Sequence, residues 1–193
     1  MNRRDAIKRS FLVIGGTAIS TSVLSGLLVS CQKEMTLAWT PEFLTEDQAK
    51  TLTAALDVLL PTTDTPGALD AGVPQFWDQL AKDYLPEEDQ KKFLDMLAAM
   101  NTDSEAEYEK TFPQLSNKQQ TELLTAYDQA AFGEGTGEFA MNEFYPDFKQ
   151  SACWAFCTSE KGATEHLAFL FDPREYKNCV SLEEVGGKVV VYP

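Results

Sequence analysis

The sequence predicts an all-α protein: a single helical domain of about five to seven helices, preceded by an N-terminal signal and lipid anchor. Two observations support this fold class. Apolar residues recur every three or four positions along most of the chain, and the only β-prone run, residues 186–193, is too short to form a sheet alone. The chain has 193 residues, 44% of them hydrophobic, which suffices for one buried core and not for two full domains.

The composition excludes several classes of function. The formal charge is −14, from 16 Lys and Arg against 30 Asp and Glu, and such a chain would repel a phosphate backbone, so we expect no nucleic acid partner. The single histidine, His166, excludes the common zinc and iron sites that need two imidazoles. We therefore expect no metal site, no cofactor site and no catalytic residues in this chain.

Residues 1–30 have the features of a twin-arginine-type lipoprotein signal peptide. Arg3 and Arg4 lie in a short basic region, which is followed by 23 residues without a charge. That length could cross a bilayer, but its glycines, serines and threonines fit a processed signal better than a lipid-facing helix. The stretch contains Cys31 in a Leu-Val-Ser-Cys sequence that resembles a lipobox, whose cysteine receives a diacylglycerol and becomes the mature N-terminus. The alternative is an uncleaved anchor with a chance cysteine.

We expect the mature chain to be exported and anchored to a bacterial membrane by the lipid on Cys31, facing the periplasm or the cell exterior. Residues 31–44 would form a lipidated tether and residues 45–193 the helical domain. Cleavage would leave 12 basic against 29 acidic side chains, a formal charge of −17, which favours a partner with a basic face. Twin-arginine export usually carries proteins that fold or load a cofactor first. This chain has no cofactor motif, so one explanation is export together with a partner that has one.

Capping boxes and prolines define the first three helices. Thr45 and Gln48 have capping-box spacing, and the helix that they start ends before Pro61. The loop that follows contains two prolines, a glycine and three threonines, which disfavour helix and strand. A second helix begins near Pro74 and a third after Pro86. The inward positions are Phe76, Trp77, Leu80 and Tyr84 in the second helix, and Phe93, Leu94, Leu97 and Met100 in the third.

The second half of the chain continues the helical pattern. Residues 101–113 are acidic and weakly periodic, and they predict one short helix at most. Ser116 and Gln119 form another capping-box pattern, the glycines that follow residue 132 indicate a flexible linker, and Pro146 marks a last helix start. Aromatic residues gather around that last helix, where we expect core packing rather than partner docking: Phe139, Phe144, Tyr145, Phe148, Trp154 and Phe156.

Three cysteines remain once Cys31 is lipidated, and outside the cytoplasm one disulfide can form among them. Cys153 and Cys157 lie one helical turn apart, which disfavours a bridge within a regular helix. Either of them can pair with Cys179, and Cys157 with Cys179 is the pair predicted here. A redox or metal role would need a lowered thiol pKa or further ligands, and the sequence spaces none suitably.

Ser159, Glu165 and His166 are the residues that suggest a hydrolase. They lie within two helical turns, where three reactive atoms rarely converge, and the chain lacks the Gly-x-Ser-x-Gly motif of a nucleophile elbow. A partly exposed histidine is the simpler interpretation. A small extracytoplasmic hydrolase is the enzyme alternative.

Two segments resemble a known family. The first is Leu59–Ala68, LLPTTDTPGA, followed by Ala71–Pro74, AGVP, and the second is Phe156–Glu165, FCTSEKGATE. With a short ending motif at residues 172–179, they resemble the gluconate 2-dehydrogenase subunit 3 family in the expected order over nearly the whole mature domain. His166 departs from that pattern, which more often has an apolar residue there, and this weakens a catalytic role for it.

The resemblance implies a small, non-catalytic subunit of a membrane-associated dehydrogenase. In that family the large subunit is a GMC-type flavoprotein that holds FAD and oxidises sugars, sugar acids or polyols, and a cytochrome c subunit often accepts its electrons. The small subunit carries the export signal for the flavoprotein, which agrees with Arg3 and Arg4 here, and the lipid on Cys31 adds an anchor. A stand-alone lipoprotein that binds a carbohydrate or a protein is the alternative.

Two polar segments between helices are the candidate partner interface, because such segments are poor core material. A purely structural role is the alternative for either segment. The candidate residues are Thr62, Asp64, Pro66 and Gly67 in the first segment, and Thr158, Ser159, Glu160, Gly162, Thr164 and Glu165 in the second.

Overall fold

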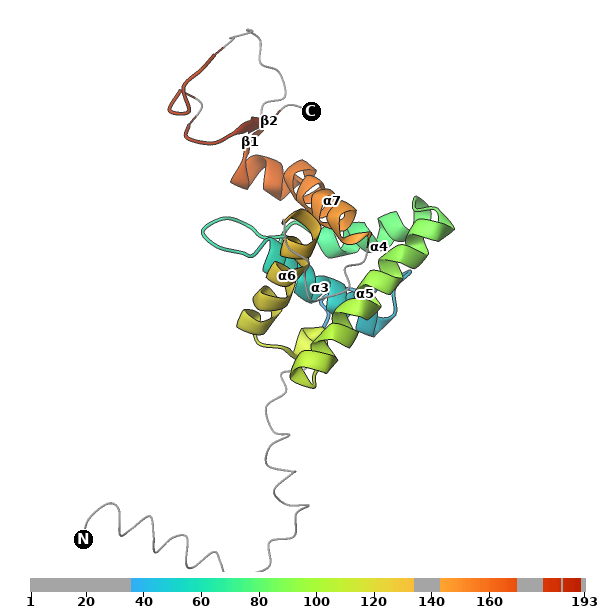
Figure 1. Cartoon of the computed structure of the whole chain (residues 1–193). Helices are drawn as coiled ribbons and strands as arrows, with labels where there is room; N and C mark the ends of the chain where they lie inside the picture. Colours follow the sequence, from blue (N-terminus) through green and yellow to red (C-terminus); the bar gives the residue numbers. More distant parts are fainter. Residues whose placement is uncertain (1–35, 134–142, 170–178, 185, 192–193) are drawn as a thin grey trace, which may run out of the picture. The chain divides into compact units, whose positions relative to one another are not determined.

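Most of the residues that the computed structural model describes are helical, which confirms the all-α prediction (Figure 1). The described residues are 36–133, 143–169, 179–184 and 186–191. The elements are α3 (Glu46–Leu59), α4 (Val73–Asp83), α5 (Glu87–Tyr108), the 3₁₀ turn η1 (Phe112–Gln114), α6 (Asn117–Phe132), α7 (Tyr145–Thr158), the π-helical turn η2 (Gly162–His166), β1 (Ala168–Phe169) and β2 (Val190–Val191).

The predicted signal and lipidation residues Arg3, Arg4 and Cys31 lie outside the described residues, and so does the aromatic residue Phe139. The linker predicted after residue 132 lies outside them too, apart from Gly133. Within the described ranges, no helix combines the length and the apolar character that crossing a membrane requires.

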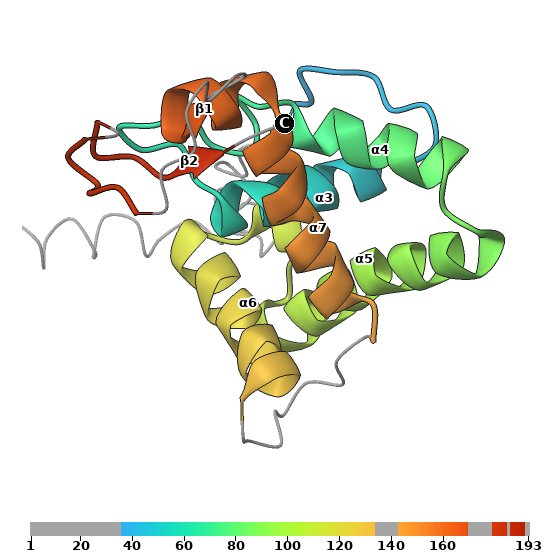
Figure 2. The same cartoon turned by 90° about the horizontal axis from the view of Figure 1, so that it is seen from above.

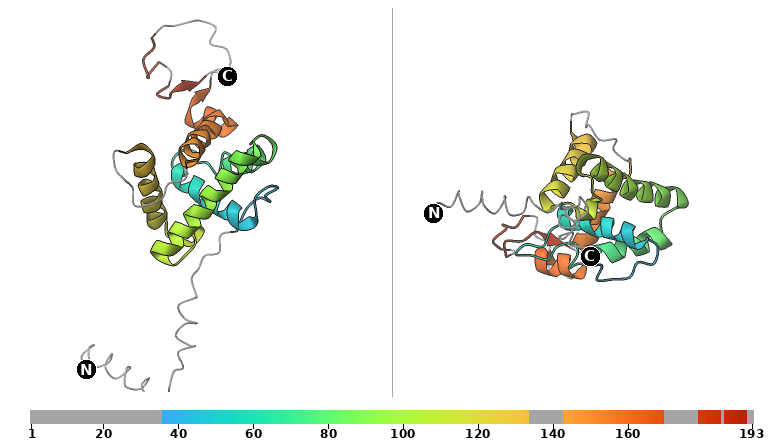
Figure 3. Two further views of the ribbon diagram at one scale, coloured as in Figure 1. Left: turned by 45° about the vertical axis from the view of Figure 1, so that its right-hand side comes forward. Right: turned by 90° about the horizontal axis from the view of Figure 1, so that it is seen from below.

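Helix α3 contacts α4, α5, α6 and η1, so it occupies the middle of the bundle. Its buried positions include Leu52 and Leu56, which are fully covered by these neighbours. Helix α7 packs on α4 and α6 (Figure 2), and α5, at 22 residues the longest helix among the described residues, runs diagonally past the other helices (Figure 3). The sequence predicted the starts of the five α-helices in the described part of the chain to within one or two residues.

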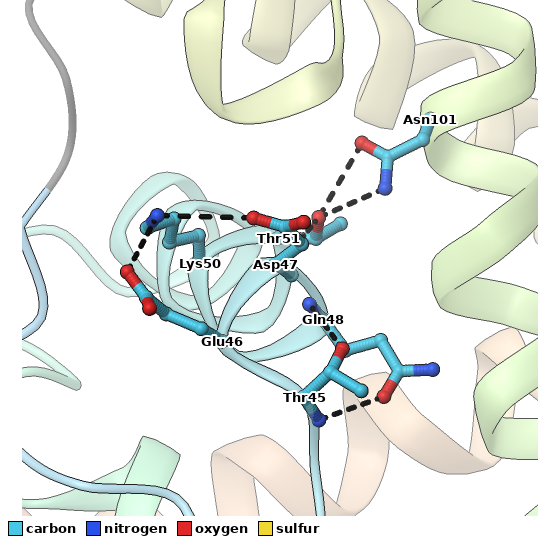
Figure 4. Close-up of polar contacts among 7 residues, drawn as sticks. All are labelled: Thr45, Glu46, Asp47, Gln48, Lys50, Thr51 and Asn101. Carbon is cyan, nitrogen blue, oxygen red and sulfur yellow. Dashed lines mark hydrogen bonds and ion pairs between the residues drawn. The ribbon is translucent and has the colours of Figure 1, made fainter.

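Both predicted capping boxes are present. The backbone N–H of Thr45 donates to Oε1 of Gln48 at 2.9 Å, and the N–H of Gln48 donates back to Oγ1 of Thr45 at 3.3 Å (Figure 4). Ser116 and Gln119 repeat the arrangement at the start of α6. Each such cap satisfies backbone donors that the first helical turn leaves free, and contributes about 0.5–2 kcal/mol.

The prediction for residues 101–113 was wrong, because α5 continues through them as far as Tyr108. Tertiary contacts stabilise this acidic stretch. Asn101 donates to Oγ1 of Thr51 on α3 at 3.0 Å (Figure 4) and accepts from the N–H of Phe112 at 3.0 Å. The buried hydroxyl of Ser104 donates to a carbonyl one turn earlier in α5. Asn101 therefore joins α3, α5 and η1. Such a long-range contact cannot be read from the spacing of apolar residues in the sequence.

An aromatic cluster forms the centre of the core. The ring centroid of Trp77 on α4 lies 5.2 Å from that of Phe93 on α5 and 5.2 Å from that of Phe148 on α7. All three side chains are 2% exposed or less. The three helices therefore meet at this cluster. Burying side chains of this size contributes about 1.5–3 kcal/mol each to the stability of the fold.

The predicted inward side chains Phe76 and Tyr84 are instead exposed, by 38% and 77%. The buried face of α4 passes through Val73, Trp77 and Ala81, which repeat every four residues. Phe76 lies one position before Trp77, about 100° around the helix, and this turns it towards solvent. Tyr84 lies beyond the last residue of α4 as its C-cap, where no neighbouring helix in the described part of the chain covers it.

Two tyrosine–aspartate contacts join α5, α6 and α7. The hydroxyl of Tyr127 on α6 donates to Asp103 on α5, and the hydroxyl of Tyr145 on α7 donates to Asp128 on α6 at 2.9 Å. Lys149 completes the second contact at 2.6 Å from the Asp128 carboxylate. Burial, followed by the neighbouring carboxylate, raises the pKa of both tyrosines well above its usual value, so both hydroxyls remain donors.

The β-prone tail pairs with a short segment after η2. Ala168 lies opposite Val190 and Phe169 opposite Val191 in a parallel pair. The N–H of Ala168 donates to the carbonyl of Val189 at 2.9 Å, and Lys188 donates to the carbonyl of Glu165. The tail thus finds its strand partner beside the second candidate segment, which the sequence did not predict.

The buried carboxylate of Asp78 on α4 holds the segment that precedes α3. It accepts hydrogen bonds from the backbone N–H groups of Glu42 at 2.7 Å, Phe43 at 3.2 Å and Leu44 at 2.9 Å. Lys82, one turn further along α4, pairs with the Glu42 carboxylate at 2.7 Å. Leu37 and Trp39 also pack against the core, so the last part of the predicted tether is attached to the domain.

Candidate functional site

The two candidate segments lie side by side, although about a hundred residues separate them in sequence. Nδ1 of His166 lies 3.1 Å from Oγ1 of Thr65, and the positive charge of Lys161 acts on the carboxylate of Asp70. We call the surface formed by residues 61–70 and 158–166 the two-segment face. The packing of α4 against α7 brings the segments together, because the first leads into α4 and the second follows α7.

A carboxylate closes the first segment into a fixed loop. Oδ2 of Asp70 accepts from the hydroxyl of Thr62 at 2.6 Å and from the N–H of Gly67 at 2.9 Å. These two hydrogen bonds, and then the charge of Lys161, hold the pKa of Asp70 below its usual value. Asp70 was not among the residues predicted from the sequence; an acid three residues after the glycine of a Pro/Gly loop is the signal that could have identified it.

Gly67 shapes this loop from within. It is buried, and a Cβ there would lie 2.5 Å from the backbone nitrogen of Thr62 and 2.7 Å from the carbonyl oxygen of Leu60. Only glycine, which has no Cβ, permits the backbone at residue 67 to lie this close to the backbone of residues 60–62. Among the predicted interface residues of the loop, Thr62 and Asp64 are exposed and available to a partner, Pro66 is half-buried, and Gly67 has a structural role.

The second segment is fixed by a serine hydroxyl at the end of α7. Oγ of Ser159 donates to the carbonyl of Phe156 at 2.7 Å and accepts from the N–H of Gly162 at 3.0 Å. A Cβ on Gly162 would overlap that same Phe156 carbonyl, so this position also requires glycine. The π-helical turn η2 begins here, with the N–H of Leu167 donating to Gly162 five residues earlier at 2.9 Å.

The exposed side chains of the second segment lie around this serine. Thr158 donates to the carbonyl of Trp154 at 2.9 Å and Thr164 to that of Glu160 at 2.7 Å, so both hydroxyls are oriented by the backbone. Glu160, Thr164 and Glu165 are exposed. Like the loop, the segment combines a glycine that only shapes the backbone with polar side chains that face solvent.

The residues considered for a hydrolase do not form a triad. The hydroxyl of Ser159 is occupied by the backbone contacts above, and His166 instead contacts Thr65 and packs edge-on against the ring of Phe156, with centroids 5.4 Å apart. No hydrogen bond that the structure shows among the described residues joins Ser159, Glu165 and His166. This arrangement does not activate the serine as a nucleophile.

The predicted disulfide between Cys157 and Cys179 is not formed in this structure, in which Cys153, Cys157 and Cys179 are all free thiols. Cys153 and Cys179 are exposed, and Cys157 is half-buried in α7. Burial, then the nearby Cys153, raises the pKa of Cys157, which keeps it a protonated thiol of low reactivity. Within the described ranges, no three His, Cys, Asp or Glu side chains are grouped closely enough to hold a metal ion.

The expectation of core packing is confirmed for most of the aromatic group and wrong for one member. Four of the residues are buried: Phe144, Tyr145, Phe148 and Phe156. Trp154 is 60% exposed, because it points away from the α7 face that carries Phe148, Ala152 and Ala155. It lies one turn before Thr158 and thus borders the two-segment face.

The fold and this face define a class: a small helical domain that presents two polar segments, both fixed by internal hydrogen bonds, on one surface. A family model described as gluconate 2-dehydrogenase subunit 3 matches residues 46–173, and the chain belongs to this family. The match includes both segments of the two-segment face. No curated protein and no solved structure shows a significant match to the chain.

Proposed function

We propose that this chain is the non-catalytic small subunit of a membrane-associated, GMC-type flavin dehydrogenase that oxidises a sugar, a sugar acid or a polyol. The observation that carries the proposal is the family match over residues 46–173, whose name is that of a dehydrogenase subunit. Catalysis and FAD belong to the partner flavoprotein, and a cytochrome c subunit is the proposed electron acceptor.

In this proposal the chain exports and anchors its partner. Arg3 and Arg4 direct a folded complex to twin-arginine export, and the lipid on Cys31 holds it at the membrane surface, facing the periplasm or the cell exterior. The arrangement explains why a chain without a cofactor motif would carry a signal for folded cargo.

The two-segment face supports a binding role. Its exposed residues include Thr62, Asp64, Glu160 and Thr164, and the backbone beneath them is fixed by Asp70 and Ser159 before any partner arrives. A surface that is already ordered loses little conformational entropy on binding, so more of its contact energy contributes to affinity.

Co-purification tests the proposal. The full-length lipoprotein, tagged at its C-terminus, is extracted from native membranes in mild detergent, and the eluate is examined by mass spectrometry and by flavin absorbance. We expect a yellow eluate that contains a GMC-type flavoprotein without a signal peptide of its own. A colourless eluate that contains the lipoprotein alone would refute the proposed function and favour the stand-alone binding protein.

A further inference from the structure

Two exposed aromatic rings from different helices contact each other beside the two-segment face. Phe76 on α4 and Trp154 on α7 have ring centroids 6.3 Å apart and planes inclined at 52°. Their exposed fractions are 38% and 60%. We call these two residues the aromatic pair. The packing of α4 on α7 holds them in place, so the pair is a fixed feature of the surface.

The aromatic pair differs from the other exposed rings of the helices. Tyr84 stands at the end of α4, and Phe132 at the end of α6 has Lys149 over its ring at 5.9 Å from the centroid. Single exposed apolar side chains are normal on soluble proteins, whereas contiguous ones mark interaction sites. Trp is also among the residues that contribute most to protein interfaces.

Both members of the pair lie close in sequence to one of the two segments. The N–H of Phe76 donates at 3.1 Å to the carbonyl of Gly72, which follows the first segment by two residues. The carbonyl of Trp154 accepts from the hydroxyl of Thr158 at 2.9 Å, at the start of the second. Along the chain, Phe76 therefore lies within two helical turns of the first segment and Trp154 within one turn of the second.

Charge is distributed unevenly over this surface. The residues one turn away from the aromatic pair along α4 and α7 are uncharged: Gly72, Leu80, Gln150 and Thr158. The two-segment face carries four exposed carboxylates against one exposed lysine: Asp64, Asp70, Glu160 and Glu165 against Lys161. An apolar centre with a polar, acidic border has the anatomy of a protein interface.

The negative charge of the chain and of this surface determines which kind of partner can bind here. The formal charge of −14 opposes association with a second copy of this chain and with anionic lipid headgroups. It favours a protein surface whose apolar socket is bordered by Lys and Arg, because such a border is complementary to the four carboxylates.

We propose that the aromatic pair is the centre of the docking site for the catalytic flavoprotein, with Trp154 inserted into an apolar socket and the carboxylates of the two-segment face contacting a basic border. This inference rests on the proposed function and specifies where the partner binds.

The test compares three variants of the full-length lipoprotein in the co-purification experiment. Trp154→Ala and Phe76→Ala remove the pair, and Tyr84→Ala removes an exposed aromatic ring from the other end of α4. We expect Trp154→Ala to weaken the complex about 30-fold, the loss typical of a central interface residue, and Phe76→Ala to weaken it about 10-fold. Tyr84→Ala should retain wild-type amounts of flavin. Thermal unfolding of each variant shows whether it folds. Trp154→Ala and Tyr84→Ala should change it little, and Phe76→Ala should lower the unfolding temperature slightly, because only 38% of Phe76 is exposed.

Native cysteines provide a second measurement. Cys153 directly precedes Trp154 and is exposed, and Cys179 is an exposed reference thiol. In the reduced complex, we expect maleimide to label Cys179 at the rate of the free lipoprotein and Cys153 at least 10-fold more slowly.

The outcomes separate the two proposals. If wild type retains the flavoprotein while Trp154→Ala and Phe76→Ala retain it equally well, the docking site is refuted and the proposed function stands. Equal losses in Tyr84→Ala, or unprotected Cys153 in the complex, refute the docking site as well. If wild-type protein retains no flavoprotein, both proposals fail.

Discussion

Replacement of Asp78 tests how strongly the segment before α3 is held to the domain. The Asp78→Ala variant leaves three backbone N–H groups without their acceptor, those of residues 42, 43 and 44. Hydrogen bonds to a charged group contribute about 1.5–3 kcal/mol each, and three that share one carboxylate do not add fully. We expect the free energy of unfolding to fall by about 3–5 kcal/mol, a large share of the 5–15 kcal/mol typical of a domain.

Urea unfolding of the purified chain, followed by tryptophan fluorescence, measures this loss. Lys82→Ala is the matched control, because Lys82 contacts the same segment through an ion pair whose side chains are 44% and 70% exposed, and solvent screens such pairs so that they contribute little to stability. Trp39 lies in the held segment and Trp77 in the core, so Trp39→Phe in the variant background separates release of the segment from global unfolding.

If the free energy of unfolding of Asp78→Ala lies within about 0.5 kcal/mol of that of the Lys82→Ala control, the Asp78 carboxylate does not hold the segment as proposed, because water then replaces it at little cost. Asp78→Asn should lose less than Asp78→Ala, because its amide oxygen still accepts one or two of the three hydrogen bonds.

Four further predictions concern the second segment, the loop and the signal. Gly162→Ala should lose about 2–4 kcal/mol in urea unfolding, because its Cβ overlaps a carbonyl of α7, and a loss below about 1 kcal/mol would contradict this. The hydrogen bonds that lower the pKa of Asp70 in the folded state also stabilise the fold at neutral pH. This contribution begins to fall near pH 3.8, the usual pKa of Asp, and is lost as the pH drops through the lowered pKa. Relative to wild type, Asp70→Asn should therefore lose more stability at pH 7 than at pH 2; the same difference at both values would exclude the linkage. Changing Arg3 and Arg4 to Lys should retain both lipoprotein and flavoprotein in the cytoplasm, and flavoprotein export by this variant would argue against escort. Cys31→Ala should still export the flavoprotein but release it from membranes in fractionation, and flavoprotein that stays with the membranes would contradict anchoring through Cys31.

Local signals explain why the sequence predicted the helices well. The capping boxes at Thr45 and Ser116 act within four residues, and the structure contains both. Pro74 and Pro146 lie in first turns, where proline costs no backbone hydrogen bond. The C-terminal part of α5 could not be predicted in this way, because Asn101 stabilises it through contacts with two other elements.

Side-chain direction was less predictable than helix position. Phe76 and Trp154 are large and apolar, yet their exposure depends on which face of α4 or α7 the neighbouring helices cover. Tyr84 is exposed because α4 ends one residue before it. The spacing of the candidate residues likewise could not show that Thr65 meets His166, since helix packing alone brings those two positions together. The candidate segments were therefore found from composition and resemblance, and their common surface only from the structure.

In the proposed lipoprotein, the packing of Leu37 on the core limits how far the domain can move from the membrane. About 6 residues separate Cys31 from Leu37, and an extended chain spans at most about 3.6 Å per residue. The segment between the lipid and the domain therefore reaches no further than roughly 22 Å. A flavoprotein carried by this domain would stay within about one protein diameter of the lipid surface, where a membrane-bound electron acceptor meets it at a high effective concentration instead of by free diffusion.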